Sequence, residues 1–328
     1  MKYIDNENVH DPRVNLAIEE YALRHLPIDD TYLLFYVNEP CIIVGKNQNT
    51  AEEINRDYVE ENNVHVVRRL SGGGAVYQDK GNLNFSFITK DDGDSFSNFK
   101  KFTQPVIDTL KKLGVDAQLS GRNDIHAGDR KISGNAQYTT KGRMFSHGTL
   151  LLDSDIEQVV MALNVSDEKI RSKGIKSIRS RVANINEFLD HKMNVDELKK
   201  AILEFVFAEG DVETQQLTEE DWEGIHKISK ERYQNWDWNY GKNPKFDLHR
   251  SKKFDAGLID IRMNVKGNVI TDVKIFGDFF GVGEVADVED LLKDVRYEEK
   301  AIHEALQDLD MTHYFGRVSK EELIELIY

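Results

Sequence analysis

Three consecutive glycines behind two arginines form the stretch of this sequence best suited to chemistry. Arg68 and Arg69 end a predicted strand, and a Ser-Gly-Gly-Gly-Ala run follows at 71–75. Glycine has no Cβ, so a ligand can approach the backbone closely, and successive backbone N–H groups can converge on an anion. Arginine adds a planar fork of donors that suits phosphate or carboxylate. The stretch therefore predicts a pocket for a phosphorylated or carboxylated ligand. The alternative is a flexible hairpin turn beside surface arginines.

Lys131 is a second candidate because it follows a tight turn and precedes small residues. The sequence from Lys131 to Ala136 reads Lys-Ile-Ser-Gly-Asn-Ala. Beside small residues a lysine reaches a ligand without steric competition, and its compact charge suits a carboxylate or an α-phosphate. Lysine is mostly a surface residue, so an ordinary solvated lysine at the end of a hairpin is the alternative.

Two further features carry titratable groups. His147 and Gly148 precede an apolar strand, where the histidine either faces a ligand or satisfies the end of that strand. Residues 169–181 hold six lysines and arginines in an otherwise acidic chain. Such a run can meet phosphates or an acidic protein partner, or it can compensate nearby carboxylates.

The composition excludes several classes of protein. The chain has 328 residues and a formal net charge of −15, so its long-range field disfavours general binding to nucleic acid or anionic membrane. Cys41 is the single cysteine and lies in an apolar run, which predicts a buried thiol in a reducing compartment. The first residues lack the apolar core of a signal peptide, and we expect a cytoplasmic protein. The sequence contains no P-loop, zinc-ligand spacing or Gly-x-Ser-x-Gly elbow.

The elements that must position these residues follow from periodicity and punctuation. Asp11 and Pro12 predict the N-cap and first residue of an amphipathic helix. A Lys-Gly-Asn turn at 266–268 joins two alternating runs, which predicts a hairpin, and two or three helices follow it. Elsewhere we expect strands over 32–37, 41–44, 64–69, 83–89, 115–119, 131–138 and 144–152, and helices over 51–62, 99–113, 155–163, 195–207 and 219–233.

Residues 236–246 lack periodicity and contain Gly241 and Pro244, so we interpret them as a link between two domains. The expected domains are residues 1–245, which carry the candidate site, and residues 246–328, a small α+β unit. The fold class predicted for the whole chain is α+β.

Taken in order, four of these motifs resemble the lipoate–protein ligase family. They are Arg-Arg-x-Ser-Gly-Gly-Gly-Ala-Val at 68–76, Gly-Arg-Asn-Asp at 121–124, Lys-Ile-Ser-Gly-x-Ala at 131–136 and His-Gly-Thr-Leu-Leu at 147–151. The resemblance implies the large form of the enzyme with a C-terminal accessory domain. It also implies a mixed-sheet catalytic domain of the biotin/lipoate ligase type, related to class II aminoacyl-tRNA synthetases.

The activity implied is ATP-dependent conversion of free lipoate to lipoyl-AMP with release of pyrophosphate, and then transfer to a lysine of a lipoyl domain. Lys131 matches the family lysine that contacts lipoate and nucleotide, and so becomes the expected catalytic residue. Asp124 is the candidate Mg²⁺ ligand. The implied adenylate site comprises Arg69, Ser71, Gly72, Gly73, Gly74, Ala75, Val76, Tyr77, Lys131, Gly134 and Ala136. The implied lipoate site comprises Leu16, Val44, Val76, Lys131 and His147.

The implied partners are lipoyl domains of 2-oxoacid dehydrogenase E2 subunits and the glycine cleavage H protein, bound by a monomeric enzyme. Because lipoyl domains tend to be acidic, the expected docking residues are Lys173, Lys176, Arg179 and Arg181. Gln78 departs from the family, where histidine is expected. The alternatives are an octanoyl or lipoyl transferase working through Cys41, a biotin–protein ligase, whose Gly-Arg-Gly-Arg pattern is missing here, and a non-catalytic lipoate-binding module.

Overall fold

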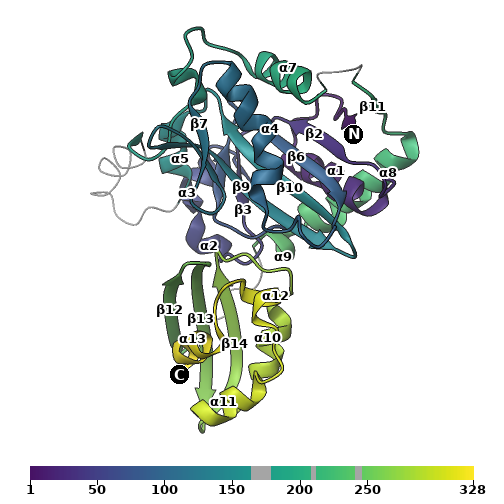
Figure 1. Ribbon diagram of the computed structural model, residues 1–328. Coiled ribbons are helices and arrows are strands. Elements are labelled where there is room, and N and C mark those ends of the chain that lie inside the picture. Colours follow the sequence, from purple (N-terminus) through teal and green to yellow (C-terminus); the bar gives the residue numbers. More distant parts are fainter. Residues whose placement is uncertain (164–178, 208–211, 241–245) are drawn as a thin grey trace. The chain divides into compact units, whose positions relative to one another are not determined.

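The computed structural model of the protein describes residues 1–163, 179–207, 212–240 and 246–328 (Figure 1). The chain divides into two compact units. The first comprises Met1–Ile43, Glu52–Arg68 and Val76–Asn239, and the second comprises Val44–Ala51, Arg69–Ala75 and Tyr240–Tyr328. The predicted boundary at 245/246 adjoins residues 241–245, which lie outside the described residues, and it stays a prediction.

A mixed sheet dominates the first unit. Among the described residues it has eight strands, in the spatial order β11 (Thr214–Gln215), β1 (Lys2–Ile4), β2 (Tyr32–Tyr36), β6 (Asn82–Lys90), β10 (Arg143–Leu151), β9 (Arg130–Thr140), β8 (Asp124–Ala127) and β7 (Ala117–Ser120). Strand β1 pairs in parallel with β2 and β11, and the remaining neighbours are antiparallel. Sequence reasoning missed β8, because its four residues are too short to show an alternating pattern.

The two faces of this sheet differ in character. On one face, Phe85 and Phe87 of β6 belong to a core shared with helices α4 (Phe99–Lys112) and α7 (Val195–Val206) (Figure 1). The ring of Phe87 lies 6.1 Å from that of Phe102 in α4. On the other face, helix α1 (Pro12–His25) packs against β6 and β10. Successive strand residues alternate between faces, so the polar residues of β6 point toward α1.

Helix α1 begins as the sequence predicts. The Asp11 carboxylate accepts a hydrogen bond from the backbone N–H of Arg13 at 2.8 Å, and Pro12 occupies the first turn. Pro12 needs no N–H there, because the first helical N–H groups have no intrahelical partner. The helix turns Glu19 and Glu20 inward, and each is only 2% exposed. Two buried carboxylates on one helix require partners. Glu19 pairs with His147, and Glu20 pairs with Arg24, Arg232 and Tyr233.

The strands on either side of the glycine run in the sequence belong to a small sheet. Its strand order is β4 (His65–Arg68), β3 (Cys41–Val44) and β5 (Val76–Gln78). Sequence reasoning missed β5, which has three residues. The predicted helix over 51–62 is wrong: the structure has α2 (Thr50–Glu53) and α3 (Arg56–Glu61). Asn55 separates them, because its side chain caps α3 and also donates to the Met161 carbonyl at 2.9 Å.

The rest of the first unit is helical. It includes α5 (Ile156–Ala162), a 3-10 turn at Ile185–Glu187 and α8 (Glu219–Ile228). The helix predicted over 219–233 continues beyond α8 as a π-helix at Ser229–Tyr233. The predicted link over 236–246 is wrong at its start, where α9 (Trp236–Asn239) forms. The Asn235 side chain nucleates this turn by accepting from the N–H of Asp237 at 2.8 Å.

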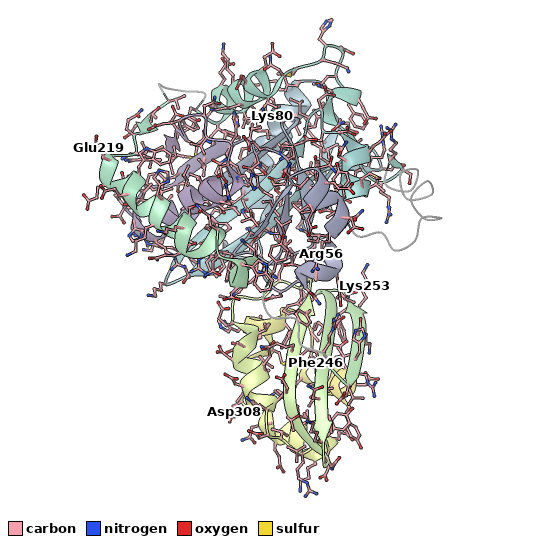
Figure 2. The ribbon with its side chains drawn as sticks, turned by 180° about the vertical axis from the view of Figure 1, so that it is seen from behind. Arg56, Lys80, Glu219, Phe246, Lys253 and Asp308 are labelled. Carbon is pink, nitrogen blue, oxygen red and sulfur yellow. The ribbon has the colours of Figure 1, made fainter. Side chains whose placement is uncertain are left out.

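The C-terminal part of the second unit contains the predicted hairpin, β13 (Gly257–Lys266) and β14 (Val269–Gly277). A third strand, β12 (Leu248–Phe254), forms the edge beside β13 and carries the Lys253 labelled in Figure 2. Sequence reasoning missed β12 because its middle is polar and exposed. Four helices follow among the described residues, rather than two or three: α10 (Val285–Leu292), α11 (Glu299–Ala305), α12 (Met311–Phe315) and α13 (Lys320–Ile327).

The α+β fold class is confirmed, with a large mixed sheet and a small C-terminal α+β part. Within the described ranges, no helix is both long and apolar enough to cross a membrane.

Candidate functional site

Lys131 lies over a glycine in the sheet of the first unit. Its Nζ is 2.9 Å from Oδ1 of Asp124, and Gly134 is the register partner of Asp124. A Cβ built on Gly134 would lie 3.0 Å from Nζ and 3.1 Å from Cε of Lys131. The absence of a side chain at Gly134 therefore lets the ammonium fold back along its own strand. The structure brings together three residues that the sequence singled out.

A β-bulge explains how Lys131 reaches this position. The register between β8 and β9 shifts between Ile125 and His126, so that His126 pairs with Lys131 and Asp124 pairs with Gly134. The Lys131 N–H donates to the Arg181 carbonyl at 2.7 Å, and its carbonyl accepts from the Ala183 N–H at 2.9 Å. The lysine backbone is thus fixed on both sides, while its side chain remains one-third exposed.

His147 is tied to helix α1. Its Nδ1 lies 2.9 and 3.1 Å from the two carboxylate oxygens of Glu19, and both side chains are buried. A carboxylate accepts, so Nδ1 donates to Glu19. His147 pairs in register with Ala136 of β9 and Ser86 of β6. Gly134, Ala136 and His147 therefore share the face of the sheet that packs against α1.

Sequence reasoning missed Glu19. The available signal was its place in α1, where Glu19 and Glu20 follow the buried run Leu16–Ile18 directly. Charged residues on the inward side of an amphipathic helix are rare unless they are paired, so they indicate a polar site.

Two further polar residues lie buried on β6. The side-chain amide of Asn82 and the hydroxyl of Ser86 have no hydrogen-bond partner among the described residues. Ser86 is opposite His147, and both Asn82 and Ser86 are fully buried. Buried polar groups normally have partners, so these offer donors and acceptors to a ligand or to water. Sequence reasoning assigned neither a role. Polar residues at every second position of a strand, namely Asn82, Asn84 and Ser86, are the signal.

Gln78, the departure from the family pattern, belongs to a neutral network. Its Oε1 accepts from Nδ2 of Asn38 at 2.7 Å and from Nδ2 of Asn84 at 3.2 Å. Gln78 is 4% exposed and pairs in register with Cys41. A glutamine that orients two asparagines in this way holds the small sheet against β6.

The glycine run lies in the second unit and is organised around Arg69. The guanidinium Nη2 donates to the carbonyls of Gly72 at 2.7 Å and Gly74 at 2.9 Å, and Nε donates to Oγ of Ser71 at 3.0 Å. Gly73 has a φ of 92°, which favours glycine. The Gly72 and Gly74 carbonyls therefore point toward the Arg69 guanidinium. The N–H groups of the same peptides point in the opposite direction.

Close packing also explains the first glycine of the run. A Cβ on Gly72 would lie 2.5 Å from the Phe279 carbonyl oxygen, which belongs to the same unit. The Gly277 N–H donates to the Asn47 carbonyl at 2.8 Å, and Nζ of Lys46 lies 2.9 Å from Glu284. Segments 44–51 and 69–75 thus pack directly against the end of β14.

The remaining predicted residues are placed as follows. Val76 and Tyr77 lie in β5, paired with Ile43 and Ile42, and burial raises the pKa of Tyr77. Leu16 and Val44 are buried, at 2% and 0% exposed. Arg179 forms an exposed ion pair with Glu157 at 2.9 Å. Lys173 and Lys176 lie outside the described residues.

The predicted site residues are divided between the two units. The first unit contains Leu16, Val76, Tyr77, Asp124, Lys131, Gly134, Ala136, His147, Arg179 and Arg181. The second unit contains Val44, Arg69, Ser71, Gly72, Gly73, Gly74 and Ala75.

Comparison with known proteins assigns the chain to a family. Residues 11–207 match the lipoyl protein ligase A/B catalytic domain, and residues 243–327 match the bacterial lipoate protein ligase C-terminus. The chain belongs to the lipoate–protein ligase family. Lipoate-protein ligase LplJ of Bacillus subtilis (strain 168) is 62% identical over 331 residues, and lipoate–protein ligase 1 of Staphylococcus aureus (strain Mu50) is 55% identical over 327 residues. Both alignments cover 100% of each chain.

Solved structures of lipoate ligases have the same fold. P. falciparum LipL1 in complex with lipoate has a TM-score of 0.79 at 26% identity, covering 99% of this chain and 97% of that one. The bipartite ligase of Thermoplasma acidophilum, described together with its E2 lipoyl domain, has a TM-score of 0.67 at 32% identity, covering 75% and 98%. A lipoate-protein ligase A bound with ATP has a TM-score of 0.63 at 29% identity, covering 73% and 98%. The predicted family is confirmed, and the family is enzymatic.

Proposed function

We propose that this lipoate–protein ligase activates free lipoate with ATP and transfers the lipoyl group to a lysine of a lipoyl domain. The observation that carries the proposal is the Lys131 ammonium seated over Gly134 and beside Asp124. It occurs in a family whose similar structures include one with lipoate and one with ATP. A compact cation at this point suits both the carboxylate that attacks and the phosphate that is attacked.

In the first step a carboxylate oxygen of lipoate attacks the α-phosphorus of ATP. The new bond is O–P, the bond to the β-phosphate oxygen breaks, and pyrophosphate leaves. Negative charge is spread over the α-phosphoryl oxygens, where fixed donors are most effective. Lys131 supplies a cation, and the turn at residues 71–75 supplies backbone N–H groups. The Arg69 guanidinium shapes that turn by donating to the carbonyls of Gly72 and Gly74.

In the second step the amine of the acceptor lysine attacks the acyl carbonyl of lipoyl-AMP. An amide bond forms, AMP leaves, and the amine loses a proton. AMP is a good leaving group, so no protein nucleophile is needed. Cys41 is 0% exposed, and burial raises the pKa of its thiol well above the ordinary range, which makes it unsuited to carry an acyl group.

Asp124 fits the role of a Mg²⁺ ligand. Mg²⁺ is commonly held by one or two carboxylates together with substrate phosphates and water, and Asp124 is one-third exposed beside Lys131. Bound there, the ion would neutralise phosphate charge. Asp124 also orients Lys131 without the ion, because its Oδ1 accepts directly from the ammonium.

We assign the apolar tail of lipoate to the side of the sheet that faces α1. Leu16, Val44 and Val76 supply apolar surface, and His147 supplies a ring nitrogen. The nucleotide is assigned to Arg69, residues 71–77 and the small residues Gly134 and Ala136. Strand β5 offers the adenine base backbone donors and acceptors at Val76 and Tyr77. In this proposal the catalytic domain is residues 1–245, and the accessory domain is residues 246–328.

The acceptors proposed are lipoyl domains of E2 subunits and the glycine cleavage H protein, with a cytoplasmic monomer as the active form. Charge supports this assignment, because Arg179 and Arg181 follow a basic stretch that includes Lys173 and Lys176. A basic surface steers acidic partners and suppresses like-charged ones.

The decisive experiment is ATP–pyrophosphate exchange by the purified protein with and without lipoate, in the wild type and in Lys131→Ala. We expect lipoate-dependent exchange that falls by about 10³-fold in the variant, as for removal of a preorganised cation or donor at developing charge. Exchange without lipoate would contradict the proposal. Acyl transfer without ATP that is lost in Cys41→Ser would instead establish a transferase, and lipoate binding without either reaction would establish a binding module.

A further inference from the structure

The two arginines before the glycine run have different surroundings. The guanidinium of Arg69 bonds to the loop that follows it. The guanidinium of Arg68 lies within the first unit, where Nε donates to the Trp238 carbonyl at 2.9 Å and Nη2 donates to the Asn239 carbonyl at 3.3 Å. Arg68 is 8% exposed. The two adjacent arginines therefore bond to different segments of the chain: Arg68 bonds to residues 238–239 and Arg69 bonds to the loop that follows it.

The backbone of Arg68 is bound by the same two residues. Its N–H donates to Oδ1 of Asn239 at 2.9 Å, and its carbonyl accepts from the indole N–H of Trp238 at 2.8 Å. The N–H, the carbonyl and the side chain of Arg68 are thus all engaged by α9. Such a four-bond contact fixes the position of Arg68, the last residue of β4.

Helix α9 is itself anchored to the interior. Nδ2 of Asn239 donates to the Tyr233 carbonyl at 2.8 Å, and the Arg232 guanidinium stacks on the Trp238 ring at 4.6 Å. Arg232 Nε and the Tyr233 hydroxyl both reach Oε2 of Glu20, at 3.0 and 2.9 Å. Buried Glu20 therefore links α1, through Arg232 and Tyr233, to helix α9, which contacts Arg68.

We propose that Arg68 is a positioning residue whose bonds to Trp238 and Asn239 fix the start of the nucleotide-binding turn at residues 69–75. This inference rests on the proposed function, which gives that turn its ligand. The bonds of Arg68 to Trp238 and Asn239 hold the end of β4, so Arg68 acts through Arg69, the next residue. Misplacing a group by about 1 Å can reduce a rate by about 10²-fold, which makes such an anchor effective.

Arginine suits this position better than lysine. A planar guanidinium donates in two directions at once and reaches two carbonyl oxygens without rearranging. Burial lowers the pKa of Arg68 to about 10, so it stays protonated at neutral pH. A lysine would keep the charge but lose the paired geometry.

The test compares Arg68→Met and Arg68→Lys with wild type in lipoate-dependent pyrophosphate release at varied ATP. We expect kcat/KM for ATP to fall by about 10²-fold in both, mainly through KM. Unchanged kcat/KM in Arg68→Met would overturn the proposal. Full activity in Arg68→Lys would overturn it too, because charge without geometry would then suffice.

Arg143→Met is the matched control. Arg143 also donates to two backbone carbonyls, those of Leu23 at 3.0 Å and Leu26 at 2.7 Å, but it ties β10 to the end of α1. It should lose thermal stability with little change in KM for ATP. If Arg143→Met and Arg68→Met raise KM equally, Arg68 is merely structural. Trp238→Phe removes the hydrogen bond from the indole N–H and keeps an aromatic side chain, so it serves if Arg68→Met does not fold. It should raise KM for ATP by a smaller factor.

Amide hydrogen exchange separates this proposal from the proposed function. Exchange in residues 69–75 should speed up in Arg68→Met and not in Arg143→Met, with no substrate present. If the wild type releases no pyrophosphate but this difference appears, the proposed function fails and the anchor stands. If exchange in residues 69–75 is unchanged, the anchor fails whatever the activity.

Discussion

At the scale of single residues, the candidate site depends on the position of the Lys131 ammonium group. Lys131 reaches Asp124 because Gly134 leaves room above the strand. The far end of a lysine is flexible, so an added methyl group would displace it at little cost in folding free energy. A substitution at Gly134 can therefore change the position of the Lys131 ammonium without much change in the stability of the protein.

Gly134→Ala should reduce lipoate-dependent pyrophosphate release by about 10²-fold while leaving the melting temperature close to that of the wild type. The physical reason is the 3.0 Å approach between the new Cβ and Nζ of Lys131. Steady-state kinetics and thermal unfolding provide the two measurements. Asp124→Asn is the companion variant, since it removes the charge beside the lysine without adding volume. Wild-type activity in Gly134→Ala would show that the observed lysine position is not the active one.

At the scale of elements, helix α1 supports the site from its own N-terminus. The Asp11 cap fixes where the helix begins, and so fixes the rotation that turns Glu19 toward His147 and Glu20 toward Tyr233. Burial by itself would raise the pKa of Asp11, but hydrogen bonds from the Arg13 side chain and backbone lower it overall. A carboxyl with a lowered pKa stabilises the folded state above its unfolded pKa and loses that contribution as pH falls.

Asp11→Ala should lower the free energy of unfolding by about 0.5–2 kcal/mol at pH 7. The difference from wild type should shrink as pH falls below about 4, the ordinary pKa of aspartate, and through the lowered pKa of folded Asp11. Urea unfolding at several pH values measures both effects. Asp11→Asn retains an acceptor for the Arg13 N–H, so it should keep most of the stability at pH 7. A constant difference between wild type and Asp11→Ala across this pH range would contradict the assigned charge contribution.

At the scale of the whole molecule, we expect surface charge to affect binding of the protein acceptor more than binding of the small substrates. The net charge of −15 repels acidic proteins in general, so the acidic acceptor proposed above would require a local basic surface. Arg179 is exposed and forms an ion pair with Glu157 at the surface, where ion pairs contribute little to stability. Reversing its charge should therefore change partner binding more than folding.

Arg179→Glu should raise KM for an acidic lipoyl domain by about 10-fold at low salt, with a smaller effect at high salt, and should leave ATP–pyrophosphate exchange unchanged. Transfer and exchange assays on the same preparation test this. Arg296→Glu is the control, because Arg296 is also exposed and paired with a neighbouring carboxylate, here Glu298. Equal losses in transfer and exchange would assign Arg179 to the nucleotide instead.

Sequence alone determined the features that depend on short stretches of chain. The cap at Asp11, the hairpin around residues 266–268 and most strands follow from local periodicity and turn residues. The order of the glycine, lysine and histidine motifs led to the family. Errors occurred where local signals were weak: β5 and β8 are short, β12 is exposed and basic, and the helix expected over 51–62 breaks at Asn55.

Only the tertiary structure decided which distant groups meet. Glu19 and His147 are 128 residues apart, and Arg68 and Trp238 are 170 apart. A pattern of residue types does not specify such pairs, because they depend on how α1, β4, β10 and α9 pack. The same holds for the two arginines before the glycine run. They are the same residue type, but the packing around them directs the Arg68 side chain to α9 and the Arg69 side chain to the turn at residues 69–75.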